Sequence, residues 1–307
     1  MCGKGGAIGR MDRTKLALAC MGLFSTGAAL AYTMGIYDHG LLVPGARHAG
    51  VGDTTAVGLV GHGCTADGFP FDVYWTFFDE NSNHVTDGRF QMSEKDVYPF
   101  VWAAESGLGL EGRTGYLVFT ADTDLDGALT PADVPCLAGE AFHVTAADAD
   151  VAYLPVWPIA YADYNAGAGV PDLTRMDAGT IGNLSAGAPI GDTLLMRYAT
   201  AAGDSTGIVI WSANDIDGTY TVNLYDDEEN RRSVNFTLPN TEQNVIDPAS
   251  IPGTPAGFVN GFIEWTTPDP GTPLNGVVSY SVIHAQAFSA RQTVVNPHHP
   301  PAAAAPP

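Results

Sequence analysis

The sequence predicts an all-β protein made of two tandem, sequence-related antiparallel β-sandwich domains of the Ig-like kind. The 307-residue chain is long enough for two domains, and its 45% hydrophobic content is typical of a packed globular protein. Strand-forming residues are frequent, whereas 36 glycines and 21 prolines leave few windows long enough for a helix. The third observation is that features of the first half of the chain return in the second half.

Residues 1–31 have the organisation of a secretory signal peptide. Basic residues precede an apolar stretch that starts at Leu16 and ends in the small-residue pattern Ala29-Leu30-Ala31. The stretch is shorter than the ~20 residues that a membrane-spanning helix needs. We therefore expect a secreted, extracellular or cell-surface protein, with the periplasm as a further compartment, and no integral membrane segment after processing.

The chain is strongly acidic, with 34 Asp and Glu residues against 13 Lys and Arg residues and a formal net charge of −21. Such a surface repels the phosphates of nucleic acids and of anionic lipids, and it attracts divalent cations. The composition thus argues against nucleic-acid and membrane binding.

An internal repeat sets the domain organisation. The corresponding segments are 41–42 with 194–195, 52–60 with 203–211, 74–81 with 220–228, 115–119 with 261–265, and 141–142 with 287–288. Each copy supplies short strands separated by turn residues, which is the pattern of antiparallel hairpins in a sandwich.

The repeat gives the following boundaries. We expect the first β-sandwich domain at 32–157 and the second at 188–297, joined by a linker at 158–187 that is rich in Gly, Ala and Asp. The Pro/Ala segment 298–307 is expected to be a disordered, solvated tail, because it has too little apolar surface to bury.

A calcium loop is predicted at 122–133, within the first domain. Its sequence, Asp-Thr-Asp-Leu-Asp-Gly-Ala-Leu-Thr-Pro-Ala-Asp, places carboxylates at alternate positions and then a glycine, Gly127, that permits a sharp turn. Leu129 is expected to pack inward. The expected calcium ligands are Asp122, Asp124, Asp126, the carbonyl of Ala128, Thr130 and Asp133.

This loop resembles the EF-hand and dockerin-type calcium loops, and the resemblance covers these twelve residues only. Asp133 replaces the usual glutamate and shortens the last ligand arm. A strand expected at 116–120, rather than a helix, enters the loop, which favours a structural calcium site over a sensor. Chelation is then expected to loosen the first domain alone. The alternative is an acidic surface turn without a metal.

Cys64 and Cys136 remain after removal of the signal peptide. In an oxidising compartment an isolated cysteine pair is more often one disulfide than a metal or redox site. We therefore expect a Cys64–Cys136 disulfide.

Catalytic patterns are weak. The segment 203–207, Gly-Asp-Ser-Thr-Gly, is similar to the Gly-Asp-Ser-Gly-Gly motif of chymotrypsin-like proteases, with His62 upstream, but the repeat places Thr54 where a nucleophilic Ser205 would be needed. A turn before a strand explains it better. The five tryptophans could form a carbohydrate-stacking face, although most are expected in the core.

These observations favour a non-enzymatic, secreted or cell-surface, calcium-stabilised protein with a structural, adhesive or self-assembling role. Exposed strand edges can pair with other strands, so a second copy or a surface assembly is the first expected partner. The alternative is an extracellular carbohydrate-binding module or an enzyme that acts on a polysaccharide.

Overall fold

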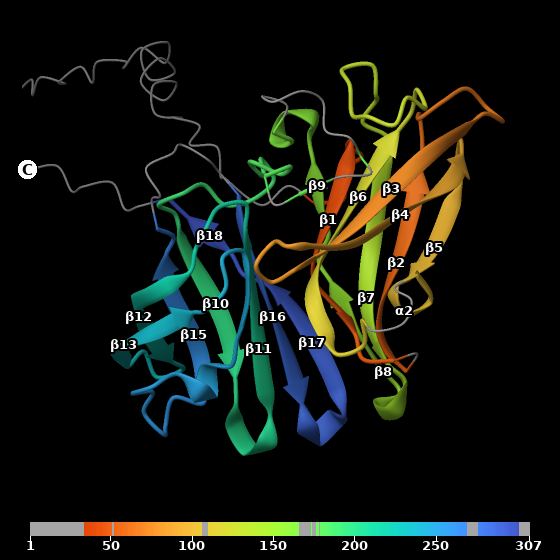
Figure 1. Cartoon of the computed structure of the whole chain (residues 1–307). Helices are drawn as coiled ribbons and strands as arrows, with labels where there is room; N and C mark the ends of the chain where they lie inside the picture. Colours follow the sequence, from red (N-terminus) through yellow and green to blue (C-terminus); the bar gives the residue numbers. More distant parts are fainter. Residues whose placement is uncertain are drawn as a thin grey trace, which may run out of the picture. The chain divides into compact units, whose positions relative to one another are not determined.

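The computed structural model describes residues 34–50, 52–105, 110–165, 173, 176–177, 179–268 and 276–300. The expected signal peptide, residues 1–31, lies outside the described residues, as does the segment 301–307. The described chain is mostly β-strand and forms three antiparallel sheets (Figure 1). The prediction of a β protein is confirmed. In the described ranges no helix is long and apolar enough to cross a membrane.

The largest sheet has the strand order β4-β3-β6-β1-β2-β7-β8, with β5 also paired to β2 and β9 paired to β1. Its strands are β1 (Gly40–His48), β2 (Asp53–Gly61), β3 (Pro70–Asp79), β4 (His84–Ser93), β5 (Val97–Val101), β6 (Arg113–Asp122), β7 (Leu137–Thr145), β8 (Asp150–Leu154) and β9 (Trp157–Ile159). The short helix α2 (Trp102–Glu105) follows β5.

The other two sheets have the orders β13-β12-β15-β10-β18 and β14-β11-β16-β17. Their strands are β10 (Thr193–Ala199), β11 (Ser205–Ser212), β12 (Gly218–Asp226), β13 (Arg231–Leu238), β14 (Gln243–Ile246), β15 (Asn260–Thr266), β16 (Val277–Ala285), β17 (Ala290–Val295) and β18 (His298–His299). Single 3-10 turns are η1 (Ala146–Asp148), η2 (Tyr161–Asp163), η3 (Ala201–Gly203), η4 (Pro248–Ser250) and η5 (Gln286–Phe288).

The burial of each strand follows from its side-chain alternation. β13 buries Val234, Phe236 and Leu238 and exposes the residues between them, as expected for an outer strand with one face on the core. β6 is buried along nearly its whole length, because strands flank it on both sides and apolar side chains fill both of its faces.

The order of pairing in the first half of the chain recurs in the second half. Strands β4-β3-β6-β1-β9 pair in the same sequence as β13-β12-β15-β10-β18, and β5-β2-β7-β8 pair as do β14-β11-β16-β17. In the first half one register pair, His48 with Thr54, joins the two groups into a single sheet. The same topology therefore arises twice from the chain.

The register corrects one of the predicted correspondences. Ala56 of β2 pairs with Phe142, and Gly207 of β11 pairs with Val282. Since the strands starting near Ala56 and Gly207 correspond, Phe142 matches Val282 and not Phe288, which lies in η5. The predicted match of 141–142 with 287–288 is wrong. Both segments read Ala-Phe, and a two-residue identity is too short to fix a strand register.

Two hydrophobic clusters form the core. The larger contains the buried side chains of the first half together with Val209, Trp211, Val278 and Tyr280 from the second half. The smaller lies within the second half and includes Trp265. The segment expected to be a linker, 158–187, adds buried side chains to the larger cluster, namely Ile159, Tyr164, Leu173, Met176, Ile181, Leu184 and Ala186.

Ordered structure also continues beyond the predicted end of the second domain. His298 and His299 form β18 and pair with Leu194 and Thr193 of β10. The buried His298 ring lies 2.8 Å from a carboxylate oxygen of Asp192. The prediction of a solvated tail is wrong for these two residues, since a backbone edge and a carboxylate distant in sequence hold them.

Candidate metal centre

The predicted loop starts where β6 ends, at the buried residue Asp122. One of its carboxylate oxygens accepts the backbone amide of Gly127 at 2.9 Å, and the other accepts that of Asp126 at 3.2 Å. The strand thus holds the first carboxylate, and the loop folds back over it. The expected entry from a strand is confirmed.

Three carboxylates meet at this point. Asp122, Asp124 and Asp126 each offer an oxygen, and these oxygens all lie within 4.8 Å of one another. Gly127 has a φ of +82°, and Leu129 is fully buried, as the sequence predicts. Clustered carboxylate oxygens suit hard divalent cations, so this group could hold a metal ion.

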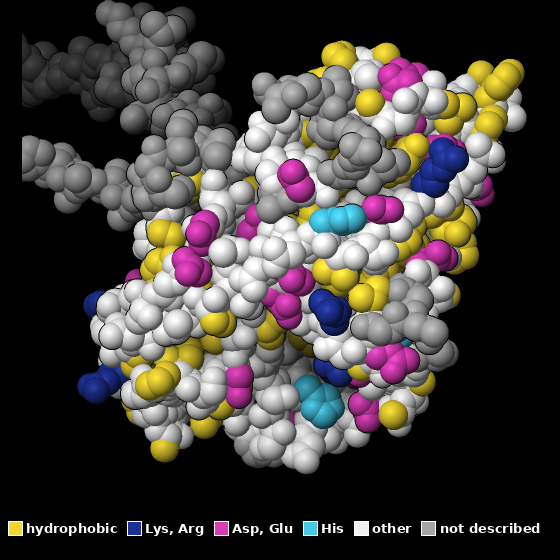
Figure 2. All heavy atoms as spheres, in the orientation of Figure 1, with side chains coloured by type: hydrophobic (Ala, Val, Ile, Leu, Met, Phe, Trp, Pro, Cys, Tyr) yellow, Lys and Arg dark blue, Asp and Glu magenta, His cyan; other side chains and the backbone are white. Residues whose placement is uncertain are grey.

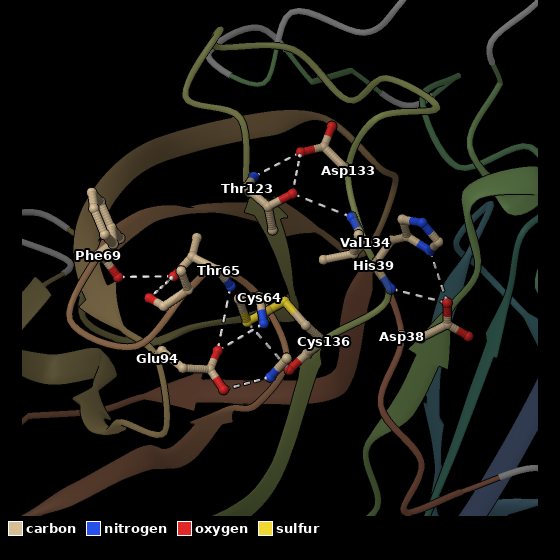
Figure 3. Close-up of a disulfide and its surroundings, with 12 residues drawn as sticks. Asp38, His39, Cys64, Thr65, Phe69, Glu94, Thr123, Asp133, Val134 and Cys136 are labelled. Atoms are coloured by element: carbon tan, nitrogen blue, oxygen red, sulfur yellow. Dashed lines mark hydrogen bonds and ion pairs between the residues drawn. A yellow bond between two sulfur atoms is a disulfide. The ribbon is translucent and has the colours of Figure 1, made fainter.

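Asp133, the last expected ligand, closes the loop. One of its carboxylate oxygens accepts the amide of Thr123 at 2.7 Å, and the other accepts the amide of Thr130 at 2.7 Å. Figure 3 shows Asp133 facing Thr123 next to the disulfide. The hydroxyl of Thr130 also donates to Asp124 at 3.4 Å. The ligand roles of Ala128, Thr130 and Asp133 stay predictions.

Asp122 lies in surroundings that disfavour its negative charge. Burial raises the pKa of its carboxyl group, the amide of Gly127 opposes that rise, and the charge of Asp133 adds to it. A bound cation would stabilise the ionised carboxylate and reverse the effect of burial.

The predicted disulfide between Cys64 and Cys136 is confirmed, with Cα atoms 5.0 Å apart. Glu94, the residue after β4, holds the backbone beside the disulfide (Figure 3). Its carboxylate accepts hydrogen bonds from the amides of Gly63 and Cys64, both at 2.9 Å. These amides, that of Gly63 first, lower the pKa of Glu94. The disulfide therefore fixes the chain just after the acidic loop.

A buried carboxyl group that the sequence did not indicate joins the two halves. The hydroxyl of Tyr116 in β6 donates to Glu242 at 2.7 Å, and Ser82 bonds to the same hydroxyl. Burial raises the pKa of Glu242 to about 7. The amides of Glu242 and Gln243 both donate to the carbonyl of Glu80. No local pattern marks Glu242, because its partners are far away in the sequence.

A second connection between the halves is centred on His143. One ring nitrogen lies 2.9 Å from the guanidinium of Arg291, and the other lies 2.6 Å from Asp53. Since Arg291 can only donate, that nitrogen accepts and the other nitrogen carries the proton, which makes the ring neutral. Burial lowers the pKa of His143. Arg291 is also paired with Asp150 at 2.7 Å.

Ser205 is the residue that a chymotrypsin-like motif would require as the nucleophile. The residue is exposed at the start of β11 and pairs in register with His284, and within the described ranges no hydrogen bond joins Ser205 to a histidine. All five tryptophans are buried, which confirms that they belong to the core. They therefore do not form an exposed stacking face for a sugar.

Most of the charged side chains on the visible face are acidic. Figure 2 shows Asp and Glu side chains spread over the visible face, with fewer Lys and Arg side chains between them. Comparisons with protein-family models, curated proteins and solved structures found no match to this chain.

Proposed function

We propose that the chain is an exported, calcium-stabilised protein of two tandem Ig-like β-sandwich domains, with a structural, adhesive or self-assembling role. The observation that carries the calcium part is the convergence of Asp122, Asp124 and Asp126 within 4.8 Å at the end of a buried strand. The recurring order of strand pairing supports the two-domain part.

Calcium fits the acidic loop better than zinc or a redox metal. Calcium takes six to eight oxygen ligands from carboxylates, carbonyls and water in flexible geometry, and the loop offers oxygen atoms only. The disulfide supports an oxidising compartment, which agrees with the proposed export of the chain.

A structural role is supported by how the polar groups are used. Glu242 and His143 have shifted pKa values, yet each is hydrogen-bonded to the other half of the chain and so serves the packing of the halves. A polysaccharide-stacking role is less well supported, because the five tryptophans that could stack on sugars are buried.

The test is thermal unfolding of the disulfide-bonded chain with calcium and with chelator. At a calcium concentration one hundred times Kd, binding stabilises the folded state by about 2.7 kcal/mol, so the melting temperature should rise by several degrees. Asp126→Ala should abolish the shift, because it removes one of the three converging carboxylates and leaves no oxygen ligand in its place.

Asp217→Ala is the matched control, since Asp217 belongs to an exposed acidic turn with Asp215 outside the loop. It should keep the calcium shift. A wild-type melting temperature that is the same with calcium and with chelator would show that the loop is an acidic turn and no metal site.

A further inference from the structure

The two halves of the chain meet through one face of the sheet β14-β11-β16-β17. Four side chains of this face, Val209, Trp211, Val278 and Tyr280, are buried in the hydrophobic cluster of the first half. Trp211 packs edge-on against Tyr116 of β6, with the ring centroids 5.6 Å apart. This face points away from the hydrophobic cluster of the second half and forms the interface with the first half.

Tyr280 is the central side chain of this contact. Its hydroxyl donates to the carbonyl of Pro44 at 2.8 Å, and its ring centroid lies 6.2 Å from that of Trp157. Tyr280 thus fills a site beside β1, β6 and β9 of the first half.

The corresponding face of the first half carries several exposed side chains in the described chain. Tyr280 pairs with Val209 in β16 and β11, and Glu140 pairs with Gly58 in β7 and β2, so Glu140 takes the place of Tyr280. Around exposed Glu140 lie apolar side chains that we call the open face: Val60, Val97, Phe142, Val151 and Tyr153. Val97 is 64% exposed and Val151 51% exposed.

The site that Tyr280 fills in the first half is an open cavity in the second half. Pro44 pairs with Tyr116, and Arg197 pairs with Phe262, so Arg197 and Phe262 stand in the equivalent places. The cavity has a volume of about 460 Å³, and we call it the receptor cavity; its lining residues are Leu195, Arg197, Phe262, Ile283, Gln292, Val294 and Pro297.

The aromatic packing beside the two sites is also the same. Phe78 and Tyr116 stack with centroids 5.0 Å apart and planes at 16°, and Tyr225 and Phe262 stack at 4.8 Å and 16°. The second half thus keeps the backbone and the aromatic wall of the site and lacks the side chain that fills it.

Charge completes the match between the open face and the receptor cavity. Glu140, in the place of Tyr280, carries a negative charge, and Arg197, in the place of Pro44, carries a positive one. The Arg197 guanidinium donates to the carbonyls of Tyr198 and Gly261 and to Asn260, which are neutral groups. An incoming carboxylate would pair with it.

We propose that the open face of one copy docks on the receptor cavity of a second copy, with Glu140 facing Arg197, and so repeats between chains the packing of the two halves. This inference rests on the self-assembling form of the proposed function. The contact uses two different surfaces, so it leaves one open face and one receptor cavity at the ends of every assembly. Head-to-tail oligomers or filaments result.

The test uses the full disulfide-bonded chain with calcium, in sedimentation velocity over a concentration series and in negative-stain electron microscopy. Wild type should form oligomers that grow with concentration. Glu140→Arg and Arg197→Glu should each raise the dissociation constant about one hundredfold, because each places like charges against each other. The double variant Glu140→Arg/Arg197→Glu should recover assembly.

Mixing the two single variants gives the sharpest result. In the mixture the open face of each variant is opposite in charge to the receptor cavity of the other, so equimolar mixing should restore alternating head-to-tail oligomers although each variant alone stays monomeric. Glu111→Arg, at an exposed site outside both surfaces, is the matched control and should assemble as wild type does. Circular dichroism checks that each variant is folded. If Arg197→Glu does not fold, Val151→Lys can break the open face in its place.

Each negative outcome has one meaning. If wild type assembles and Glu140→Arg assembles equally well, the proposed contact is wrong and a self-assembling role stands. If wild type stays monomeric at millimolar concentration, both the contact and the self-assembling role fail, while the calcium shift remains a separate question. A mixture of the two single variants that stays monomeric would also overturn the head-to-tail contact.

Discussion

Glu242 shows how one buried carboxyl group can make the fold sensitive to pH. Its pKa rises from 4.5 to about 7 because burial disfavours the charge, and the hydrogen bond from Tyr116 only partly offsets this. The folded chain therefore keeps the Glu242 proton between about pH 4.5 and pH 7, whereas the unfolded chain releases it. Stability must fall as pH rises through this window and stay level above it.

Replacing Glu242 by glutamine should remove this fall, because glutamine is neutral at every pH. Over the window the wild-type contribution amounts to about 3 kcal/mol, taking about 1.4 kcal/mol for each pKa unit. Urea unfolding at pH 4.5 and pH 8 measures the difference for variant and wild type. Glu228→Gln, at an exposed position of the β12–β13 turn, is the control and should follow the wild type. Equal pH slopes for Glu242→Gln and wild type would contradict this account.

At the scale of the element, side chains join the edges of strands that do not pair. The hydroxyl of Thr293 in β17 donates to the carbonyl of Tyr153 in β8, and Arg291 donates to the carbonyl of Asp150. These bonds satisfy backbone carbonyls on the β8 edge and hold it against the second half. An edge that is occupied in this way is not free to pair with another chain.

The Cys64–Cys136 disulfide acts on the loops beside β3 and β7. Its cysteines are 72 residues apart, so in the chain-entropy model it stabilises the fold by about 4 kcal/mol. In urea unfolding, we expect the free energy of unfolding of Cys64→Ala/Cys136→Ala to be lower than that of wild type by about 4 kcal/mol. Reductant should destabilise wild type and leave the variant unchanged. A double variant that unfolds with the wild-type midpoint would show that the disulfide contributes nothing.

At the scale of the whole molecule, the shared cluster couples the two halves. The sequence predicts that chelation loosens the first domain alone, but Trp211 and Tyr280 of the second half are buried in the core of the first. We expect one cooperative transition, in which calcium shifts the unfolding of both halves together.

Trp211→Ala should cost about 3–5 kcal/mol and split the calorimetric transition in two, because it leaves a cavity between the halves. Trp265→Ala removes an equally buried tryptophan from the cluster within the second half and is the matched control. It should destabilise the chain without separating the halves. A single transition for Trp211→Ala, with equal calorimetric and van't Hoff enthalpies, would mean that other contacts suffice to couple them.

The sequence by itself determined the features that depend on neighbouring residues. The strand-forming segments, the turn at Gly127, the group of Asp122, Asp124 and Asp126, and the inward Leu129 follow from local spacing, since side-chain alternation and turn geometry act over a few residues. The pairing of Cys64 with Cys136 followed because no other partner remained once the signal peptide was set aside.

Only the tertiary structure decided which distant surfaces meet. Three contacts join residues that no local sequence pattern relates, because such contacts depend on how complete sheets pack. They are the hydrogen bond between Tyr116 and Glu242, the hydrogen bond between Arg291 and His143, and the pairing of β18 with β10. The same holds for Glu140 and Tyr280, which occupy equivalent places although one is charged and the other aromatic. Their equivalence follows from the backbone register, which local sequence specifies weakly. The face that carries Tyr280 is covered by the first half, whereas the face that carries Glu140 is open.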